Sequence, residues 1–385
     1  MQQDCLFKSR LNLHDESQLK TDESSYVWWC RLIRDRRWSR AQKRQLVTFF
    51  GRPELVLAAS QEQIWSIISG RPRATDSTVE QSVIDADLSW LEQHSHHLIP
   101  ITERRYPCLL RQLEDPPLAL FAIGDIGLLH EPQVAIVGSR KPTPIGDNVT
   151  RSISGGLAGL GVVVTSGMAL GIDAIAHQAA FQAGGLSIAV LGNGLDIIYP
   201  SRHRALYQQL VSNGLLVSEY PLGFKPSRYT FPQRNRIVSG LSHGVVIVEA
   251  AERSGTLITA RLAMEQNRDV MVVPGSALSS QYRGSHELLK QGAALVSSCD
   301  DVIHCLSEPL SRYLRNVDGA TTTATQAEPL PRHPLLQFIS AESTSVDDII
   351  LGSQLTSAEV SSMLLELELI GAVAIANDGG YVNLS

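Results

Sequence analysis

The stretch Val134-Ala135-Ile136-Val137-Gly138-Ser139-Arg140 decides the fold of this chain. Its apolar half predicts a buried β-strand, and the strand ends in a Gly-Ser turn that carries an arginine. Further apolar runs alternate with stretches of helical pattern; the runs are 162–165, 187–191, 215–218, 245–248 and 270–273. This alternation predicts an α/β fold with a doubly wound, mostly parallel sheet covered by helices on both faces.

The composition limits the classes of function. A net charge of −6 over 385 residues excludes a positive field over the whole protein, so an anion site must be a local patch. The five cysteines are scattered without the spacing of a zinc site or a redox pair, which is typical of a reduced, cytoplasmic protein, and we expect no metal. No apolar run reaches the ~20 residues of a membrane span, and the N-terminus lacks the apolar core of a secretory signal.

The chain is expected to fold in several parts. Residues 1–24 predict a flexible N-terminal segment, 25–98 a helical domain, 99–310 the sheet domain, 311–333 a linker rich in Thr and Pro, and 334–385 a small last domain. Two helical stretches and a hairpin in the last domain predict a winged-helix-like shape. The helical domain is dense in arginine, which we interpret as a solvated helix face, with an auxiliary nucleic-acid surface as the alternative.

Turns rich in Gly and Ser follow nearly every expected strand. In an open α/β sheet, ligands bind beyond the carboxyl ends of the strands, and such turns let a backbone approach an anion and donate hydrogen bonds to it. Turns between strands and helices favour Gly and Ser for structural reasons alone. This preference easily explains one or two such turns. It explains less well five such turns that also carry Arg and Lys. The turns include Gly138-Ser139-Arg140, Ser166-Gly167, Gly192-Asn193-Gly194 and Ser254-Gly255-Thr256.

Basic and aromatic side chains gather at or beyond the expected strand ends. The basic candidates are Arg140, Arg202, Lys225, Arg228, Arg234 and Arg236, and the aromatic ones are Tyr220, Phe224, Tyr229 and Phe231. Cations that follow a backbone, with aromatic faces for the bases, are the ingredients of sequence-tolerant single-strand binding. The structural alternative is that the rings plug the core under the loop. If Gly138-Ser139-Arg140 and Arg234-Asn235-Arg236 reach one crevice, the protein binds a phosphate backbone.

Other classes of function have weaker support in the sequence. The dinucleotide pattern GxGxxG and the P-loop pattern GxxxxGK[ST] are absent, so we expect no nucleotide cofactor. The hydrolase motif HExxH is also absent, and no catalytic residue is assigned. The alternative that stays open is a nucleotide-processing, hydrolase-type enzyme with Glu249 as its acid, and a third class is a pure interaction scaffold.

The motifs between residues 99 and 306, taken in order, resemble the DNA-processing protein A family (DprA, also called Smf). They include Val137-Gly138-Ser139-Arg140, Gly171-Ile172-Asp173 with His177, Phe231-Pro232-Gln233-Arg234-Asn235-Arg236 and Val248-Glu249-Ala250. The flanking domains match the family's layout by pattern, with a helical SAM-like domain first and a winged-helix-like domain last.

The resemblance implies an extended Rossmann fold that protects incoming single-stranded DNA and loads the recombinase RecA onto it during natural transformation and recombination. It also implies a homodimer formed through the Rossmann domain and no cofactor. The phosphate-binding positions that it implies are Ser139, Arg140, Ser166, Gly167, Lys225, Arg234, Asn235, Ser254 and Gly255, with Arg202 where the family often has a basic residue. One departure is His286, which stands where the family often has Asn.

Acidic residues are concentrated at the C-terminal end of the chain. From residue 311 onward there are three basic and nine acidic side chains, so this tail carries a net charge of −6, equal to that of the whole chain. The expected recognition helix, 356–369, has no Lys or Arg, although a winged helix that reads DNA needs cations for the phosphates. Our hypothesis is that the tail does not bind DNA and is a protein-contact or autoinhibitory module.

Overall fold

The structure is a computed structural model, and it describes residues 23–69, 79–306, 334–340, 343–369, 372–376 and 379–383. The expected linker, 311–333, and most of the expected N-terminal segment lie outside these residues. Internal contacts divide the chain into two units, one built from Met1–Glu131 and Ser187–Leu241 and the other from Pro132–Leu186 and Ser242–Ser385. Each unit is described by itself.

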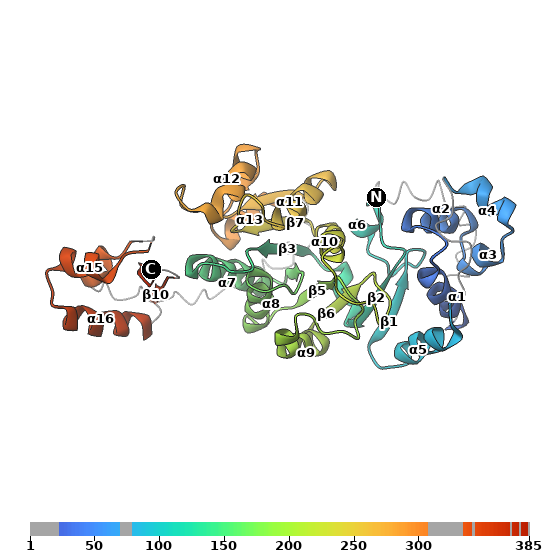
Figure 1. Cartoon of the computed structure of the whole chain (residues 1–385), viewed down its shortest axis with the longest axis horizontal. Coiled ribbons are helices and arrows are strands. Elements are labelled where there is room, and N and C mark those ends of the chain that lie inside the picture. The colour runs from blue at the N-terminus through green and yellow to red at the C-terminus, as the bar shows by residue number, and fades with distance from the viewer. Residues whose placement is uncertain are drawn as a thin grey trace, which may run out of the picture. The chain divides into compact units, whose positions relative to one another are not determined.

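The first unit begins with the expected helices (blue in Figure 1). They are α1 (Glu23–Arg34), α2 (Arg40–Phe50), α3 (Pro53–Ala58), α4 (Gln61–Ile67) and α5 (Gln81–Leu91). Ser39 and Ser60 cap α2 and α4 in capping boxes with Gln42 and Gln63, which satisfy backbone donors at both helix starts. The helices bury a shared apolar core that includes Leu32, Leu46, Val56 and Ile84.

A buried lysine lies among these helices. Lys43 on α2 is 7% exposed, and its Nζ donates to the carbonyl of Ile33 at 2.7 Å. Burial lowers the pKa of Lys43 to about 8; Arg40 adds to this effect and Asp35 opposes it. Because the unfolded chain has the ordinary value of 10.5, the unfolded state binds more protons between these two values, so folding stability rises with pH across that window.

Lys43→Met is therefore expected to raise the free energy of unfolding at neutral pH, by about 1–3 kcal/mol after the loss of one hydrogen bond is subtracted. It should also remove the rise in stability between pH 8 and 10.5. Tryptophan fluorescence during urea unfolding reports selectively on the stability of this helical region, because all five tryptophans lie within residues 28–90. A variant that is less stable than the wild type at neutral pH and keeps the same pH dependence would contradict the assignment.

The described residues of the first unit also form four strands, in the order β1-β2-β6-β5. They are β1 (His96–Pro100), β2 (Ala119–Gly124), β6 (Leu215–Ser218) and β5 (Ser187–Leu191). β5 and β6 are parallel as expected, whereas β1 and β2 are additional strands that pair antiparallel, β2 with both β1 and β6. The helical segments of this part are α6 (Cys108–Arg111), η1 (Ile126–His130), η2 (Ser201–His203), α9 (Arg204–Asn213) and α10 (Thr230–Leu241).

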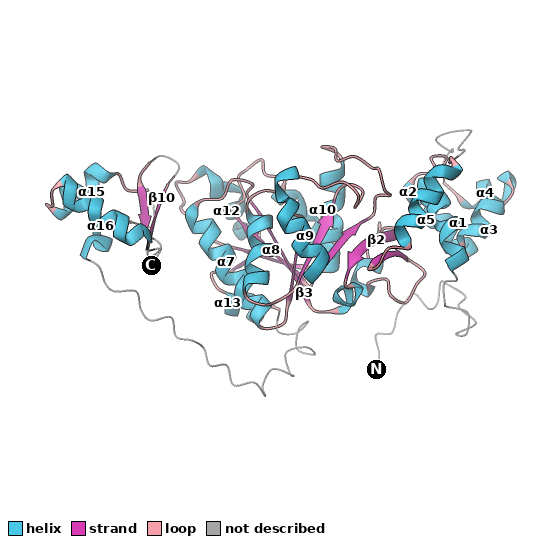
Figure 2. Cartoon of the chain, turned by 90° about the horizontal axis from the view of Figure 1, so that it is seen from below, coloured by secondary structure: helices cyan, strands magenta, loops and turns pink. Residues whose placement is uncertain are grey.

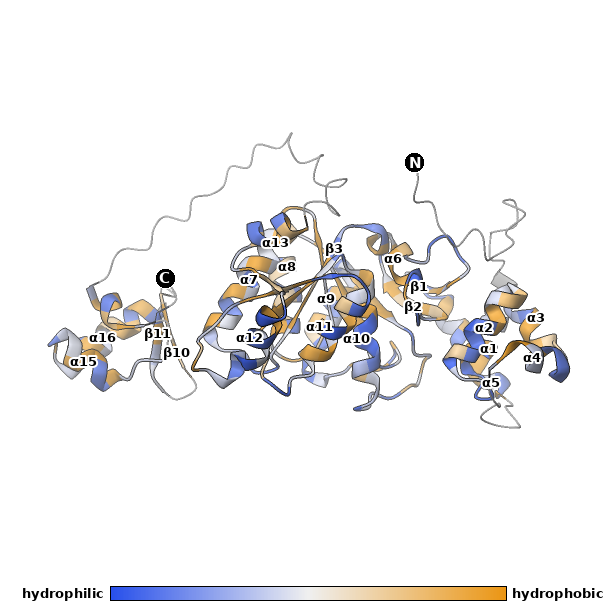
Figure 3. Cartoon of the chain, turned by 90° about the horizontal axis from the view of Figure 1, so that it is seen from above, coloured by the Kyte–Doolittle hydropathy of each residue, from blue (hydrophilic) through white to orange (hydrophobic). Residues whose placement is uncertain are grey.

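The described residues of the second unit up to residue 306 form five strands, each parallel to its neighbours, in the order β4-β3-β7-β8-β9. They are β4 (Val163–Ser166), β3 (Gln133–Gly138), β7 (Gly244–Val248), β8 (Asp269–Val272) and β9 (Ala294–Leu295). The helical segments are α7 (Pro144–Gly159), α8 (Ile172–Gln182), α11 (Thr256–Glu265), η3 (Ser280–Tyr282), α12 (Arg283–Lys290) and α13 (Cys299–Cys305). Strands and helices share one apolar core (Figures 2 and 3). The predicted α/β class, with a doubly wound and mostly parallel Rossmann-like sheet, is confirmed.

The last domain folds around an apolar cluster of its own. It consists of η4 (Pro334–Phe338), α15 (Val346–Ser353), α16 (Ser357–Leu369), and the antiparallel pair β10 (Val373–Ile375) and β11 (Tyr381–Asn383). Leu335, Ile349, Val360 and Leu364 form the centre of the cluster. The predicted helices, hairpin and winged-helix-like shape are confirmed.

Two further observations concern the described residues. None of their helices has both the length and the apolar character needed to cross a membrane. The cysteines among them are free thiols: Cys30, Cys108, Cys299 and Cys305.

Candidate nucleic-acid interface

The turn after β3 is held tightly against its neighbours in the second unit. A Cβ on Gly138 would lie 1.9 Å from the carbonyl oxygen of Val248 and 2.8 Å from Cγ1 of Ile172, so no larger residue fits. The Ser139 N–H donates to the Val248 carbonyl at 3.2 Å, and the Ser139 carbonyl accepts from the N–H of Ile172 at 3.0 Å. The turn therefore connects β3, β7 and the start of α8, and exposed Arg140 follows it directly.

Two other predicted segments of this unit lie against the same turn. Thr256, at the start of α11, donates its hydroxyl to the Gly138 carbonyl at 3.1 Å, and its N–H donates to Oγ of Ser254 at 3.2 Å. Ser166, at the end of β4, donates its hydroxyl to the carbonyl of Ile136 at 2.6 Å. The structure thus brings the predicted Gly/Ser-rich strand ends of this unit together.

These strand-end residues differ in exposure. Arg140 and Gly255 are exposed, and Ser139 and Ser254 are half-buried. Ser166 and Gly167 are buried, and the Gly167 N–H donates to Oδ2 of Asp173 at 3.1 Å. The sequence predicted phosphate contacts at all these positions. In the structure, buried Ser166 and Gly167 instead make their hydrogen bonds to other residues of the protein.

Glu249, the acid of the enzyme alternative, directly follows β7 and is 1% exposed, and its carboxylate lies at the start of α7. Its carboxylate accepts from the N–H of Thr143 at 3.0 and 3.1 Å, from the Thr143 hydroxyl, and from the hydroxyl of Tyr282 at 3.0 Å. Burial, and then the neighbouring Glu249 carboxylate, raises the pKa of Tyr282, which keeps its hydroxyl a donor. An anion with these donors at a helix N-terminus anchors α7.

In the first unit, the predicted residues lie in the loop between β6 and α10, in the first turns of α10, and, for Arg202, in η2. α10 begins at Thr230, so the Phe231–Arg236 segment does lie at a helix start. Arg202, Lys225 and Arg228 are exposed. Tyr229 is 66% exposed; the Arg228 guanidinium lies 4.8 Å from its ring centroid and donates to its hydroxyl at 2.6 Å. This is a solvent-facing aromatic ring with a cation on its face.

Two more aromatic pairs belong to this loop region. Phe231 is half-buried and lies 5.5 Å, centroid to centroid, from Tyr199, which is 46% exposed. Phe224 is 40% exposed and stacks on Tyr220 at 4.6 Å and 20°. Tyr199 was missing from the predicted site residues, although its position three residues before Arg202 is a signal that could have found it.

The basic segment of α10 faces inward more than the sequence suggested. Arg234 and Arg236 are only 5% and 7% exposed, and Asn235 is half-buried. Arg236 pairs with Glu219 and lies 3.6 Å from the carboxylate of Asp115. Its guanidinium therefore belongs to a partly buried ion-pair network of the first unit.

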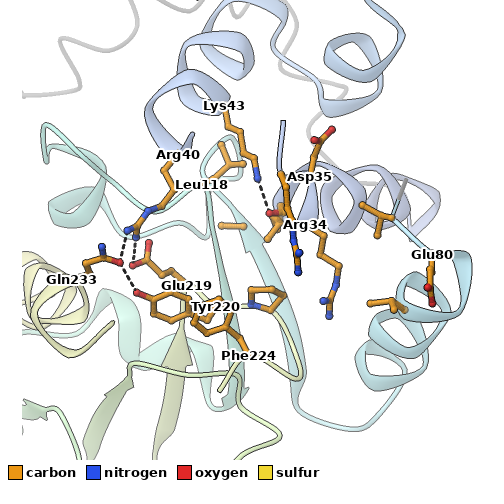
Figure 4. A pocket seen from close by; sticks show the side chains of 16 residues that line it. Arg34, Asp35, Arg40, Lys43, Glu80, Leu118, Glu219, Tyr220, Phe224 and Gln233 are labelled. Carbon is orange, nitrogen blue, oxygen red and sulfur yellow. Dashed lines mark hydrogen bonds and ion pairs between the residues drawn. The ribbon is translucent and has the colours of Figure 1, made fainter. Parts of the chain in front are cut away.

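Arg40 of α2 joins the same network. It pairs with Glu219 at 2.7 Å and donates to Oε1 of Gln233 at 2.5 Å, which also accepts from the Tyr220 hydroxyl at 3.0 Å (Figure 4). The network thus connects the N-terminal helices with the loop after β6 and the first turn of α10. The segments Gly138-Ser139-Arg140 and Arg234-Asn235-Arg236 fall in different units, and their joint use in one site stays a prediction.

His286 has a defined partner inside the second unit. Its Nε2 hydrogen-bonds the carbonyl of Gly275 at 3.0 Å. The ring therefore ties α12 to the loop after β8, at the place where the resemblance expects Asn.

The fold and these strand ends define an α/β protein with a Rossmann-like sheet, preceded by a helical domain and followed by a winged helix. A family model described as DNA recombination-mediator protein A matches residues 97–307, and one described as the DprA winged helix domain matches residues 319–379. The chain belongs to the DNA recombination-mediator protein A (DprA/Smf) family of DNA-processing proteins.

Individual relatives agree with this assignment. The chain is 45% identical to the protein Smf of Escherichia coli over 78% of its own length and 81% of that protein. It is 36% identical to the DNA processing protein DprA of Bacillus subtilis over 68% of its length and 84% of that protein. It is similar in structure to DprA of Streptococcus pneumoniae, with a TM-score of 0.63 and 35% identity over 72% of this chain and 97% of that one.

Proposed function

We propose that this protein binds single-stranded DNA as a recombination mediator, protects it, and loads RecA onto it during natural transformation and recombination. The observation that carries the proposal is the exposed aromatic and basic face of the loop after β6, where Arg228 lies on the solvent-facing ring of Tyr229. Aromatic faces with neighbouring cations bind successive bases and phosphates without reading sequence. Membership of the DprA/Smf family supports the same function.

The proposal divides the predicted residues by exposure. The phosphate contacts are the exposed cations Arg140, Arg202, Lys225 and Arg228, together with the half-buried Ser139 hydroxyl and the exposed backbone of Gly255. The stacking surfaces are Tyr229 and Tyr199. The buried members of the predicted set, together with half-buried Gly138, hold these groups in place; the buried members are Ser166, Gly167, Arg234, Arg236 and Thr256.

Binding of oligonucleotides in solution tests this function. We expect the full chain to bind a ~20-nucleotide oligothymidylate more tightly than a duplex of the same length, with affinity that falls steeply with salt. RecA loading is measured separately, as RecA-dependent ATP hydrolysis on DNA coated with single-strand-binding protein, and the dimer by mass in solution. Equal affinity for both DNA forms would refute the stacking surface, and failure to bind either would refute the function.

The C-terminal domain is expected to contribute no DNA affinity. Residues 334–385 contain no Lys or Arg at all, while the exposed acidic side chains Asp347, Asp348, Glu359 and Glu366 repel phosphates. Removing residues 334–385 should leave Kd for single-stranded DNA within about twofold, or lower it if the acidic domain competes with DNA. A loss of more than about tenfold in a truncated protein with unchanged oligomeric mass would show that the domain binds DNA.

A further inference from the structure

A cavity of about 910 Å³ lies in the first unit, beside the loop that carries the proposed DNA contacts (Figure 4). Its lining comes from α1 and the turn after it, α2, the start of α5, β2, and the loop after β6. The volume lies within the range of sites that hold small organic ligands. Part of the arginine-rich face of the N-terminal helices, interpreted from sequence as solvated, lines this cavity.

Apolar and aromatic side chains form about half of the cavity lining, and charged or polar side chains form the rest. Val83, Leu118 and Ile33 contribute aliphatic surface, and the stacked rings of Tyr220 and Phe224 contribute an aromatic wall. Burial, and then the neighbouring Glu219, raises the pKa of Tyr220 to about 12, so the Tyr220 ring stays neutral at physiological pH. A wall of this kind fits the flat face of another ring.

The cations of the lining are largely engaged by the protein itself. Arg34 pairs with Asp87 at 2.5 Å and donates to the Leu222 carbonyl at 3.0 Å, and Arg40 pairs with Glu219. The ammonium of Lys43 donates to the Ile33 carbonyl. Because the two guanidinium groups are paired with carboxylates and the ammonium of Lys43 is engaged with a backbone carbonyl, the interior of the cavity suits a neutral planar group with hydrogen-bonding edges better than a free anion.

The cavity is continuous with the proposed DNA-binding face through Phe224. This residue directly precedes Lys225 in the loop, and its carbonyl accepts from the N–H of Gly194 at 2.9 Å, which ties the loop to the turn after β5. Its ring lines the cavity and is also 40% exposed to solvent. Arg36, also in the lining, is exposed. A strand that follows the loop thus meets an aromatic ring and a cation at the cavity.

We propose that this cavity accepts a base of the bound single strand, stacked on Phe224, with the adjoining phosphate at Arg36. The inference rests on the proposed function and extends the DNA site from the loop after β6 onto the N-terminal helices. A nucleobase meets both requirements of the cavity, since it has a flat aromatic face and hydrogen-bonding edges without charge. The α1–α5 domain then has a direct part in DNA binding.

Photo-crosslinking of the full wild-type chain tests the inference. The probe is a ~20-nucleotide oligothymidylate in which one thymidine at a time is replaced by 5-iododeoxyuridine, which crosslinks to nearby aromatic side chains. Trypsin separates the two aromatic sets, because cleavage after Arg204, Arg228 and Arg234 places Tyr220 and Phe224 in one peptide and Tyr229 and Phe231 in the next. We expect crosslinks to Phe224 or Tyr220 from some positions of the strand and to Tyr229 from others.

A matched pair of variants provides the second measurement. Val83→Trp fills the cavity from α5, and Ser89→Trp adds the same ring to an exposed position of the same helix outside the lining. Val83→Trp should weaken binding of the long oligonucleotide about 5- to 10-fold, the scale of one lost base stack, and abolish the Phe224 and Tyr220 crosslinks. Ser89→Trp should change neither, and circular dichroism confirms that both variants fold.

The outcomes separate this inference from the proposed function. If the wild type binds single-stranded DNA and crosslinks through Tyr229 but never through Phe224 or Tyr220, the inference is overturned and the function stands. If the wild type neither binds nor crosslinks, the function itself fails. The wild-type crosslinks decide the matter even if Val83→Trp does not fold.

Discussion

Arg140→Ala and Lys225→Ala are each expected to weaken single-strand binding by about 1–3 kcal/mol, or about 5- to 150-fold in Kd, as for the loss of a charge-assisted hydrogen bond to phosphate. The two residues are exposed and belong to different units. Because they lie in loops of different units, their effects should add in the double variant. Arg234, an obvious choice from the sequence, is a poorer probe because its side chain is buried.

Salt dependence distinguishes lost phosphate contacts from other damage. Each substitution should reduce the slope of log K against log salt by about one, since one phosphate contact and its released counterion are removed. Lys290→Ala is the matched control, because Lys290 is exposed, pairs only locally with Glu287 at 2.8 Å, and lies outside the proposed face. Unchanged affinity and slope in both test variants would place the phosphate site elsewhere.

The sequence was sufficient for the parts of the fold with a strong local pattern. The parallel strands are continuous apolar runs between helices, and Gly138 could be recognised as a tight turn from its position after such a run. β1 and β2 were missed. β2 is Ala119–Gly124, a short run with little β-branched character after Pro116-Pro117, and β1 follows α5 closely. These segments are strands because they pair with segments elsewhere in the chain, and such pairing is not visible in the local sequence pattern.

The candidate site shows the same limit. The basic and aromatic character of the loop after β6 was visible in the sequence, but the direction of each side chain was not. Arg236 looked like a phosphate ligand, yet it is buried beside Asp115 and Glu219, which lie 121 and 17 positions away in the chain. Tyr199 became a stacking candidate only when its ring was found beside Phe231. Contacts between distant segments decide exposure, and periodicity does not report them.

Glu249→Ala is expected to lower the free energy of unfolding by about 3–5 kcal/mol, the scale for removing one partner from a buried, charge-assisted network. The substitution leaves the Thr143 N–H and hydroxyl and the Tyr282 hydroxyl without their acceptor. It also removes the anion from the start of α7, where a negative charge is stabilising. Urea unfolding followed by circular dichroism measures the loss. Exposed Glu287→Ala in the same unit is the control, and it should change stability by less than about 0.5 kcal/mol.

Glu249→Gln separates the structural role from the enzyme alternative. The amide of Gln keeps one oxygen that can accept from Thr143, but its NH2 group then faces another hydrogen-bond donor. We therefore expect the free energy of unfolding to fall by about 1–3 kcal/mol, which places this variant between the wild type and the alanine variant. If Glu249 were instead the acid of a hydrolase, the wild type would turn over nucleoside phosphates, and the Gln variant would fold with nearly unchanged stability and lose that turnover. A carboxylate that is 1% exposed and accepts from Thr143 and Tyr282 has its lone pairs directed into the protein. Stability in the order wild type, Gln, Ala, without turnover in any of the three, is therefore the result that the geometry requires.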